Sequence, residues 1–431
     1  MIGLIRPAQR IVEMKAMRKF LVLGIPAIAI CLLLYMKSQS KPYESSMSAS
    51  EKPNGMKMFS DYLDRLPPSS ENYSGTDNES DVSLLQQTEN LLVPDSFNIN
   101  DVNTSDNVVT YQYNNFREEQ RHVAFLKVHK AASTTLQTIF FRFGYERNLS
   151  FVLPEDGHYV SSSTSEFFKL IPPLYGDHYD IICNHAVFNY TKFSTFMPKD
   201  TIYLGIVREP FRQFISAFHY YKEVYHVEYL TIIPDDPIEN LILYPGRYDY
   251  NLSLTMNSMA HDFGFLHSHY NDDTDQKIHL YLEELGTVFD FVLIAEYLDE
   301  SLILMKRLLN WSFRDILYIS KNVRSSDDEV SEPLMAAFRK RNRLDYMLYE
   351  FFYGRFLKRY SEAGEDIQDE VQTFKEILVK VQTWCFNQHT ERLNINETKW
   401  NKDFTVTSLD CKILSIHELP FIKLLKERVG N

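Results

Sequence analysis

The chain has 431 residues, of which 44% are apolar and 24% charged, enough for one large domain or two medium ones with a buried core. Residues 1–37 hold six Lys or Arg and one Asp or Glu, so a net charge of −13 leaves −18 on the rest. A chain that is this acidic after residue 37 lacks the broad basic face that a nucleic-acid binder needs. The scarcity of glycine, 14 residues, excludes collagen, and the absence of an internal period excludes repeat arrays.

The first segment with a clear pattern is Phe20 to Met36, an uncharged apolar run at the short end of a membrane span. Basic residues precede it at Arg6, Arg10, Lys15, Arg18 and Lys19. The positive-inside rule therefore predicts a cytoplasmic tail (1–19) and a transmembrane signal-anchor helix (20–36), with the remaining chain across the membrane. A cleaved signal peptide is the alternative, but no small-x-small cleavage site follows Met36.

Two further features agree with a body outside the cytosol. Asn-x-Ser/Thr sequons occur at Asn72, Asn78, Asn103, Asn148, Asn189, Asn251, Asn310 and Asn396. An oxidising compartment would also allow a disulfide, and we expect Cys385–Cys411 because both residues lie in the C-terminal segment. Closing this loop would contribute roughly 3 kcal/mol in the chain-entropy model.

Residues 37–120 are rich in Ser, Asn, Asp and Glu and predict a flexible stem, because they cannot bury enough apolar area to offset their ordering entropy. The body, 121–431, divides into a core (121–325) and a C-terminal extension (326–431) that we expect to be helical. The stem would hold this body away from the bilayer.

Within the core, apolar runs typical of strands alternate with patterns typical of helices. The expected strands are 122–128, 179–185, 201–207, 290–297 and 315–319, and the main expected helices are 134–148, 208–225 and 299–311. This alternation predicts an α/β fold, with a mostly parallel sheet and helices on both faces. Residues 226–285 are expected to form helices and loops over the edge of the sheet that binds ligands.

The loop after the first expected strand lies where open parallel sheets bind ligands. The helix N-terminus that follows would offer N–H groups and a favourable dipole to an anion. Positive charge and hydroxyl donors are supplied by Lys127, Lys130, Ser133, Thr134 and Thr135. The pattern GxxxxGK[ST] is absent, which disfavours a triphosphate site. A capped helix with solvated lysines is the alternative.

A second feature follows the third expected strand. Arg208 stands just past its end, and Ser216 lies eight residues later, about two helical turns on and on a nearby face. A guanidinium with a helical hydroxyl suits a second phosphate. The alternative is that Arg208 pairs with Glu209 or Glu223.

The two features together resemble the sulfotransferases, whose donor is 3′-phosphoadenosine 5′-phosphosulfate (PAPS). The loop of that family, Lys-Thr-Gly-Ser/Thr-Thr, corresponds to residues 130–134, and its Arg and later Ser correspond to Arg208 and Ser216. The departures are Ala131 for the usual Thr and Ala132 for the frequent Gly. One hydroxyl is lost, whereas the backbone N–H donors remain.

The flanking sequence is similar to the galactose 3-O-sulfotransferase family, which includes the galactosylceramide sulfotransferases, from about residue 121 to 325. The resemblance implies a P-loop-like sulfotransferase fold and a single-pass type II Golgi membrane protein with a lumenal catalytic domain. It also implies transfer of the sulfuryl group to the 3-hydroxyl of galactose in a glycolipid or glycoprotein glycan. The choice between a glycolipid and an N- or O-glycan acceptor stays open. Whether the protein forms a homodimer also stays open.

The resemblance assigns roles within the site. Lys130 would stabilise charge on the departing phosphate, and His185, 23 residues before Arg208, would be the base. The donor would be held by Lys127, Lys130, Ala132, Ser133, Thr134, Thr135, Arg208, Ser216 and Arg324. A structural role for His185 and a glutamate base at Glu296 are the alternatives.

No metal is expected, because sulfuryl transfer needs none and the histidines at 261, 267 and 269 lack zinc-site spacing. A Golgi glycosyltransferase would share this topology, but it would use an acidic metal site, and the triplet Asp273-x-Asp275 follows no expected strand. A glycan-binding relative without turnover is also compatible with Ala131 and Ala132.

Overall fold

The structure is a computed structural model that describes residues 118–249, 253–266, 275–319, 330–387 and 391–429. The expected cytoplasmic tail, the membrane span and nearly all of the stem lie outside these ranges. Among the helices of the described ranges, none combines the length and apolar character needed to cross a membrane.

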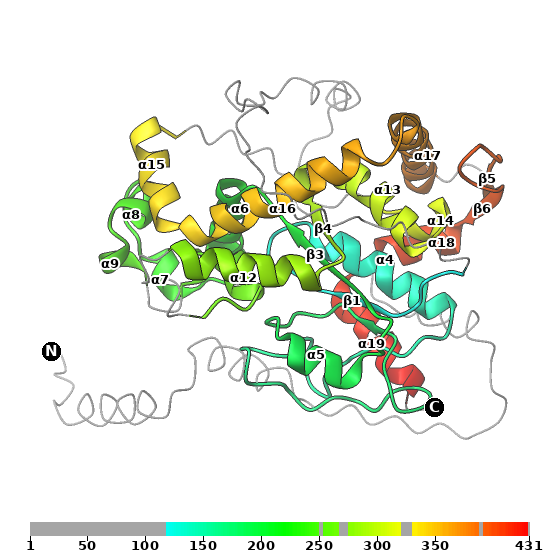
Figure 1. The fold of residues 1–431 in the computed structure, drawn as a ribbon, viewed down its shortest axis with the longest axis horizontal. Helices are drawn as coiled ribbons and strands as arrows, with labels where there is room; N and C mark the ends of the chain where they lie inside the picture. Colours follow the sequence, from blue (N-terminus) through cyan, green and yellow to red (C-terminus); the bar gives the residue numbers. More distant parts are fainter. Residues whose placement is uncertain (1–117, 250–252, 267–274, 320–329, 388–390, 430–431) are drawn as a thin grey trace, which may run out of the picture. The chain divides into compact units, whose positions relative to one another are not determined.

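Four parallel strands form the main sheet in the order β2-β1-β3-β4, and Figure 1 labels β1, β3 and β4. They are β1 (Val123–Phe125), β2 (Ile181–Ile182), β3 (Ile202–Val207) and β4 (Phe291–Ile294). All of their residues are buried, which explains why each strand is a continuous apolar run instead of an alternating one. The prediction of a parallel α/β sheet is confirmed.

Helical segments cover both faces of this sheet. Phe125 pairs in register with Leu204, and its ring lies 4.9 Å from Phe140 of α4 (Ser133–Glu146). The next residue in β3, Gly205, faces the other way, because successive residues of a strand alternate. A Cβ there would come within 3.0 Å of the Phe263 ring, so glycine allows this close approach.

The expected fifth strand at 315–319 is wrong. Residues Phe313–Ile316 form the short helix α14. Ser312 accepts a hydrogen bond from the Asp315 N–H, while the Asp315 carboxylate accepts from the Ser312 N–H. This reciprocal capping box favours a helical turn over an extended strand.

Helices occupy most of the remaining core. In chain order they are α5 (Tyr190–Phe196), α6 (Pro210–His219), the π-helix η4 (Tyr220–Val224), α7 (Glu228–Thr231), α8 (Pro237–Leu243), α9 (Pro245–Tyr248), α10 (Ser258–Asp262), α12 (Asp275–Val288), the 3₁₀-helix η5 (Ala295–Tyr297) and α13 (Leu298–Leu309). The described part of 226–285 therefore consists of helices and loops, as predicted.

The C-terminal extension is helical except for one hairpin. Its helices are α15 (Glu332–Arg341), α16 (Arg343–Ser361), α17 (Ile367–Asn387), α18 (Ser408–Ser415) and α19 (Glu418–Val429). The expectation of a wholly helical extension is wrong at β5 (Arg392–Ile395) and β6 (Phe404–Thr407), which pair antiparallel. Buried Ile395 and Val406 stand among exposed residues of these strands, as expected for a hairpin with one covered face.

Two contacts fix the end of the chain. The expected disulfide Cys385–Cys411 is present and joins α17 to α18, with Cα atoms 5.4 Å apart. Helix α19, red in Figure 1, packs against α4. The last helix therefore lies beside the helix that follows the predicted anion-binding loop.

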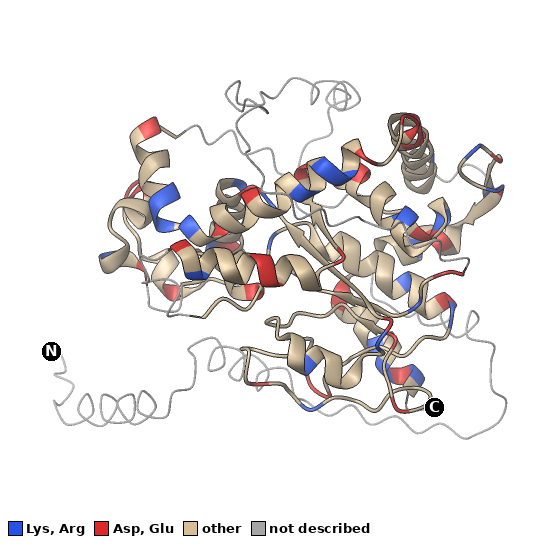
Figure 2. Ribbon diagram, viewed as in Figure 1, with Lys and Arg blue, Asp and Glu red and all other residues tan. Residues whose placement is uncertain are grey.

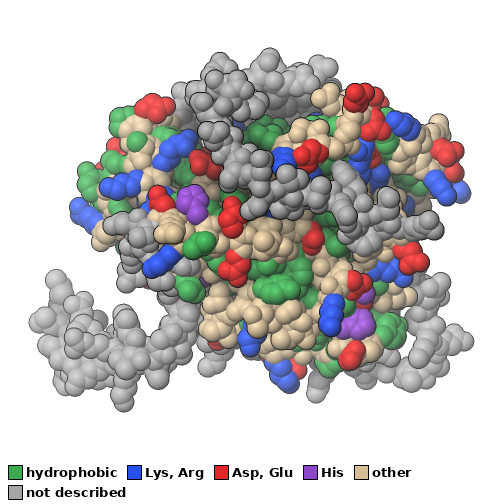
Figure 3. Space-filling view, viewed as in Figure 1, with side chains coloured by type: hydrophobic (Ala, Val, Ile, Leu, Met, Phe, Trp, Pro, Cys, Tyr) green, Lys and Arg blue, Asp and Glu red, His purple; other side chains and the backbone are tan. Residues whose placement is uncertain are grey.

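Charged residues of both signs are interspersed along the described helices (Figure 2). The face drawn in Figure 3 likewise mixes basic, acidic and hydrophobic side chains. On this face the mixed charges agree with the expectation that the body lacks the broad basic face of a nucleic-acid binder.

Candidate active site

The loop between β1 and α4 contains two residues with left-handed backbone. The φ angles are 59° at Lys130 and 56° at Ala132. For a residue with a Cβ this conformation costs roughly 1–2 kcal/mol, and such strain clusters at functional sites. Glycine adopts it without that cost, so Ala132 occupies a position that suits the glycine frequent in the resembled loop.

The first residues of α4 differ in what their side chains do. Ser133 is buried and its hydroxyl donates to the carbonyl of Val128, so it closes the loop. Thr134 is exposed and Thr135 half-buried, and the Thr135 N–H donates to the Ala132 carbonyl at 3.1 Å. The opening N–H groups of a helix lack partners within it, so this helix end can receive an anion.

Arg208 joins the second motif to this loop. It follows β3 directly, and its Nη1 donates to the carbonyl oxygen of Lys130 at 3.1 Å. Its Nε lies 4.0 Å from the Glu296 carboxylate. Ser216 lies about two turns along α6 and is partly exposed. The two sequence motifs therefore meet at the carboxyl ends of β1 and β3.

The Lys130 ammonium lies 3.7 Å above the centre of the Tyr220 ring. A cation at this distance from an aromatic face is attracted by the ring's quadrupole. Tyr220 begins η4, directly after α6. The helix that follows Arg208 thus supplies the ring that holds the Lys130 side chain.

His185 lies on the other side of Lys130, three residues after β2. Its Nδ1 is 3.1 Å from the Lys127 carbonyl oxygen. A carbonyl only accepts, so Nδ1 carries the proton and Nε2 keeps its lone pair. Burial lowers the pKa of His185 well below its usual value, and the positive charge of Lys127 lowers it further. A neutral imidazole with an available Nε2 is the form that a general base requires.

A second histidine stacks on His185. The ring centres of His129 and His185 are 4.0 Å apart at 17°. The His129 Nδ1 faces the buried Asp262 carboxylate at 2.9 Å, and the His129 backbone N–H donates to the same group at 2.7 Å. On the other side, the His129 Nε2 lies 3.2 Å from the Tyr159 hydroxyl. Asp262 therefore fixes the ring against which His185 packs.

Lys127 is held by a residue from the end of the chain. Its side chain is 1% exposed, and its ammonium lies 2.6 Å from the Glu418 carboxylate at the start of α19. Burial lowers the pKa of Lys127. Burial is the largest single effect and opposes ionisation of Glu418, but the charges of Lys127 and His158 and the polar contacts of Lys127 and Gln137 together outweigh it and leave the pKa of Glu418 lowered. By its geometry this contact is a buried ion pair, and the predicted donor-binding role of Lys127 stays a prediction.

We expect Glu418→Gln to lower the free energy of unfolding by about 3–5 kcal/mol, because it leaves the buried Lys127 ammonium without a counter-charge. Urea unfolding of the purified protein measures this. Glu427→Gln, on an exposed face of α19, is the matched control and should change stability by less than about 0.5 kcal/mol.

The double variant Lys127→Met, Glu418→Gln should recover most of that stability, because the buried charge is then absent. Its donor affinity tests the other role of Lys127, since a lysine that binds only Glu418 can be removed without changing the donor Kd. Equal stability of Glu418→Gln and Glu427→Gln would refute the buried ion pair.

The structure therefore brings Lys130, Arg208 and His185 to three neighbouring strand ends. Two further residues of the site were not identified from the sequence, Asp262 and Glu418, which lie far along the chain from the residues they contact. Arg324 lies outside the described residues, as does Asp273. Asp275 begins α12 and pairs with Arg343, so the described half of the acidic triplet has a structural partner.

Known proteins are similar to this chain. A family profile described as Galactose-3-O-sulfotransferase matches residues 1–401. "Galactose-3-O-sulfotransferase 3" of Mus musculus is 31% identical over 291 residues, which cover 63% of this chain and 64% of the relative. "Galactosylceramide sulfotransferase" of Homo sapiens is 31% identical over 280 residues, covering 63% and 65%. "Galactose-3-O-sulfotransferase 2" of Mus musculus is 32% identical over 281 residues, covering 61% and 69%.

The first two of these relatives are thus matched over slightly less than two thirds of their length. The family profile, in contrast, covers most of this chain and includes the strand ends that carry Lys130, His185 and Arg208. The resemblance found in the motifs is therefore confirmed, and the chain belongs to the galactose-3-O-sulfotransferase family.

Proposed function

We propose that this protein transfers the sulfuryl group of PAPS to the 3-hydroxyl of a galactose in a glycolipid or glycoprotein glycan. One observation carries the proposal most directly. The strand order β2-β1-β3 places Lys130 between His185 and Arg208, and Arg208 hydrogen-bonds the Lys130 carbonyl. This order supports the proposal, because the residue proposed to stabilise the leaving group follows the strand between those that carry the proposed base and the proposed second phosphate ligand.

The described residues have the chemistry to hold such a donor. The α4 N-terminus with Lys130 suits the phosphosulfate, because N–H groups and an ammonium converge there. Arg208 and Ser216 suit the 3′-phosphate, because a planar guanidinium can make two parallel hydrogen bonds to phosphate oxygens. Arg324 stays a predicted contact to the same donor. Family membership supports this assignment.

In the proposed step, the galactose 3-oxygen forms a bond to sulfur while the bond from sulfur to the phosphate oxygen breaks. His185 Nε2 takes the hydroxyl proton, and Lys130 stabilises the negative charge that develops on the departing phosphate. The products are the 3-sulfated galactoside and 3′,5′-adenosine bisphosphate. In this proposed step the sulfuryl group passes directly from the donor to the acceptor.

The test is transfer of radiolabelled sulfate from PAPS to a panel of galactosylceramide and N- and O-glycan galactosides, with linkage analysis of the product. We expect label at the galactose 3-position of at least one acceptor class. Sugar transfer that depends on manganese would instead indicate a glycosyltransferase. Tight binding of 3′,5′-adenosine bisphosphate without turnover would indicate a glycan-binding relative.

We expect Arg208→Ala to raise the Kd of 3′,5′-adenosine bisphosphate, measured by calorimetry, about 10- to 100-fold. The loss of a charge-assisted hydrogen bond, roughly 1.5–3 kcal/mol, gives this magnitude. Arg212→Ala, on the exposed side of the first turn of α6, is the matched control and should leave the Kd unchanged. Equal Kd values for the wild type and Arg208→Ala would remove Arg208 from the donor site.

A Golgi location with the body in the lumen forms part of the proposal. The sequons and the Cys385–Cys411 disulfide support it, because disulfides persist in oxidising compartments. Glycosidase sensitivity of the full-length protein, and its protection from protease in sealed vesicles, test the topology. Light scattering of the detergent-solubilised protein tests the homodimer.

A further inference from the structure

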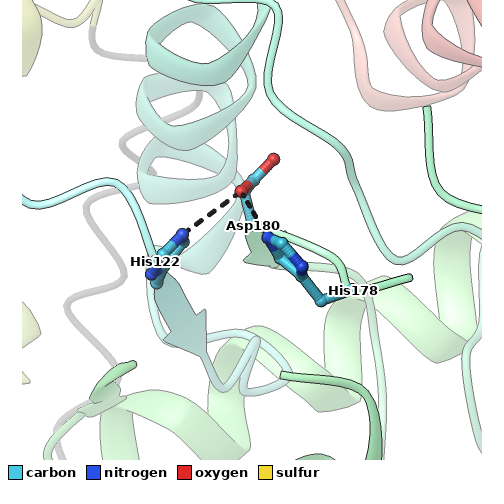
Figure 4. A group of neighbouring side chains, drawn as sticks. All are labelled: His122, His178 and Asp180. Atoms are coloured by element: carbon cyan, nitrogen blue, oxygen red, sulfur yellow. Dashed lines mark ion pairs between the residues drawn. The ribbon is translucent and has the colours of Figure 1, made fainter. Parts of the chain in front are cut away.

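Two histidines and an aspartate converge at the edge of the sheet opposite the candidate active site (Figure 4). His122 immediately precedes β1, and Asp180 immediately precedes β2, with His178 two residues earlier. Because β1 and β2 are parallel, both positions lie at the amino ends of the strands, whereas Lys130 and His185 follow the carboxyl ends. The cluster is therefore separate from the transfer site.

The ligand atoms of this cluster have the arrangement of a metal site. Asp180 Oδ1 lies 3.4 Å from His122 Nε2 and 3.9 Å from His178 Nε2. One ligand atom from each residue falls within 4.8 Å of the other two. Tetrahedral zinc, with bonds of about 2.0–2.2 Å, separates its ligands by roughly 3.4 Å. Small rotations of the side chains would bring all three atoms to that separation.

Carboxylates also face the outer nitrogens of both rings. His122 Nδ1 lies 2.8 Å from Asp200 Oδ1, and His178 Nδ1 lies 3.4 Å from Asp177 Oδ1. A carboxylate that receives the outer N–H of an imidazole fixes the tautomer in which Nε2 is free for a metal, as is usual for metal-bound histidines. Each ring is thus oriented with one nitrogen on a carboxylate and the other toward Asp180.

Asp180 is itself oriented by the backbone. Its Oδ2 accepts a hydrogen bond from the Ser150 N–H at 2.6 Å, which leaves Oδ1 toward the two imidazoles. The Asp180 carbonyl accepts from the Val123 N–H at 2.8 Å, which holds the residue beside β1 and next to His122. The backbone therefore holds Asp180 in place even before a cation binds.

We propose that His122, His178 and Asp180 bind a divalent zinc ion that joins the amino ends of β1 and β2. Two imidazole nitrogens and one carboxylate oxygen suit zinc better than calcium or magnesium, which prefer all-oxygen ligands. Water would complete the tetrahedron, because His178 is exposed. The ion has a structural role, since the reacting groups lie at the opposite edge of the sheet.

The test uses the purified full-length protein, stripped with chelator, incubated with zinc chloride and freed of excess metal by gel filtration. Bound zinc is measured by plasma mass spectrometry. The zinc content of the wild type should exceed that of each site variant by one zinc per chain. The site variants are His122→Gln, His178→Ala and Asp180→Asn. The control His279→Ala removes an exposed histidine from α12 and should match the wild type.

Thermal unfolding gives a second readout that does not depend on sulfate transfer. Zinc should raise the Tm of the wild type and His279→Ala by about 2–4 °C and leave His178→Ala unshifted. His178→Ala is the decisive variant, because its exposed side chain can be removed without opening the core. Zinc contents of wild type and His178→Ala that do not differ, or an equal Tm rise in both, would overturn the site and leave the cluster as ion pairs.

Discussion

Lys130→Ala is expected to lower kcat for sulfate transfer by about 10³-fold while leaving the fold intact. The reason is electrostatic, because a fixed cation at the departing phosphate acts where negative charge develops in the transition state. The backbone conformation argues against a folding defect, since alanine and lysine bear a similar cost at a φ of 59°. Initial rates at saturating donor and acceptor, with the unfolding midpoint of each variant, measure both effects.

Two further variants sharpen this test. Lys130→Arg retains the charge and should recover part of the lost rate, although a planar guanidinium cannot replace a compact ammonium in full. Lys192→Ala removes an exposed lysine of α5 and should leave kcat unchanged. A Lys130→Ala protein that turns over at the wild-type rate would show that the leaving group is stabilised elsewhere.

The parallel sheet could be predicted because its strands are buried on both faces. Residues Val123–Phe125 and Ile202–Val207 form continuous apolar runs, and polar loops with helices follow each. The carboxyl ends of such strands share one edge, so Lys130, His185 and Arg208 could be placed together before any contact was known. The strand order then put Lys130 in the middle, which the spacing alone did not reveal.

The role of a residue could not be predicted from the sequence where that role depends on a partner far along the chain. Asp262 lies 133 residues from His129, and nothing in its local pattern distinguishes it from a solvated acid on a short helix. Glu418 opens a C-terminal helix, where an acidic residue is ordinary, yet it pairs with buried Lys127. Both roles depend on tertiary packing that brings α10 and α19 to the loop.

Short elements were the other source of error. Residues 315–319 are apolar enough for a strand, but Ser312 and Asp315 cap a helical turn instead. The hairpin of β5 and β6 has only four residues in each strand, with one buried residue in each, so it lacks the apolar run that marks a buried strand. At the first place local capping outweighed the apolar pattern, and at the second there was no apolar run from which a strand could be predicted.

His185→Ala is expected to lower kcat about 10²- to 10⁴-fold, the usual range for loss of a general base. The Kd of 3′,5′-adenosine bisphosphate should stay close to the wild-type value, because the proposed role of His185 is to take the acceptor proton and not to bind the phosphate groups. His158→Ala removes an imidazole whose ring centre lies 6.3 Å from that of His185, and it should keep most of the activity. A His185→Ala enzyme with near-normal kcat would exclude His185 as the base.

The pH dependence of kcat/KM identifies the base in the free enzyme. A base works when deprotonated, and burial lowers the pKa of His185 below 6.5, so the wild-type kcat/KM should fall only as pH drops below 6.5. If His185 is the base, this fall of kcat/KM at low pH, the acidic limb of the profile, disappears from the residual activity of His185→Ala. If Glu296 is the base, burial raises its pKa above 4.5, and the limb persists in His185→Ala but is lost in Glu296→Gln. Glu296 follows β4, two strands beyond β1, and approaches Arg208, so we expect the first result.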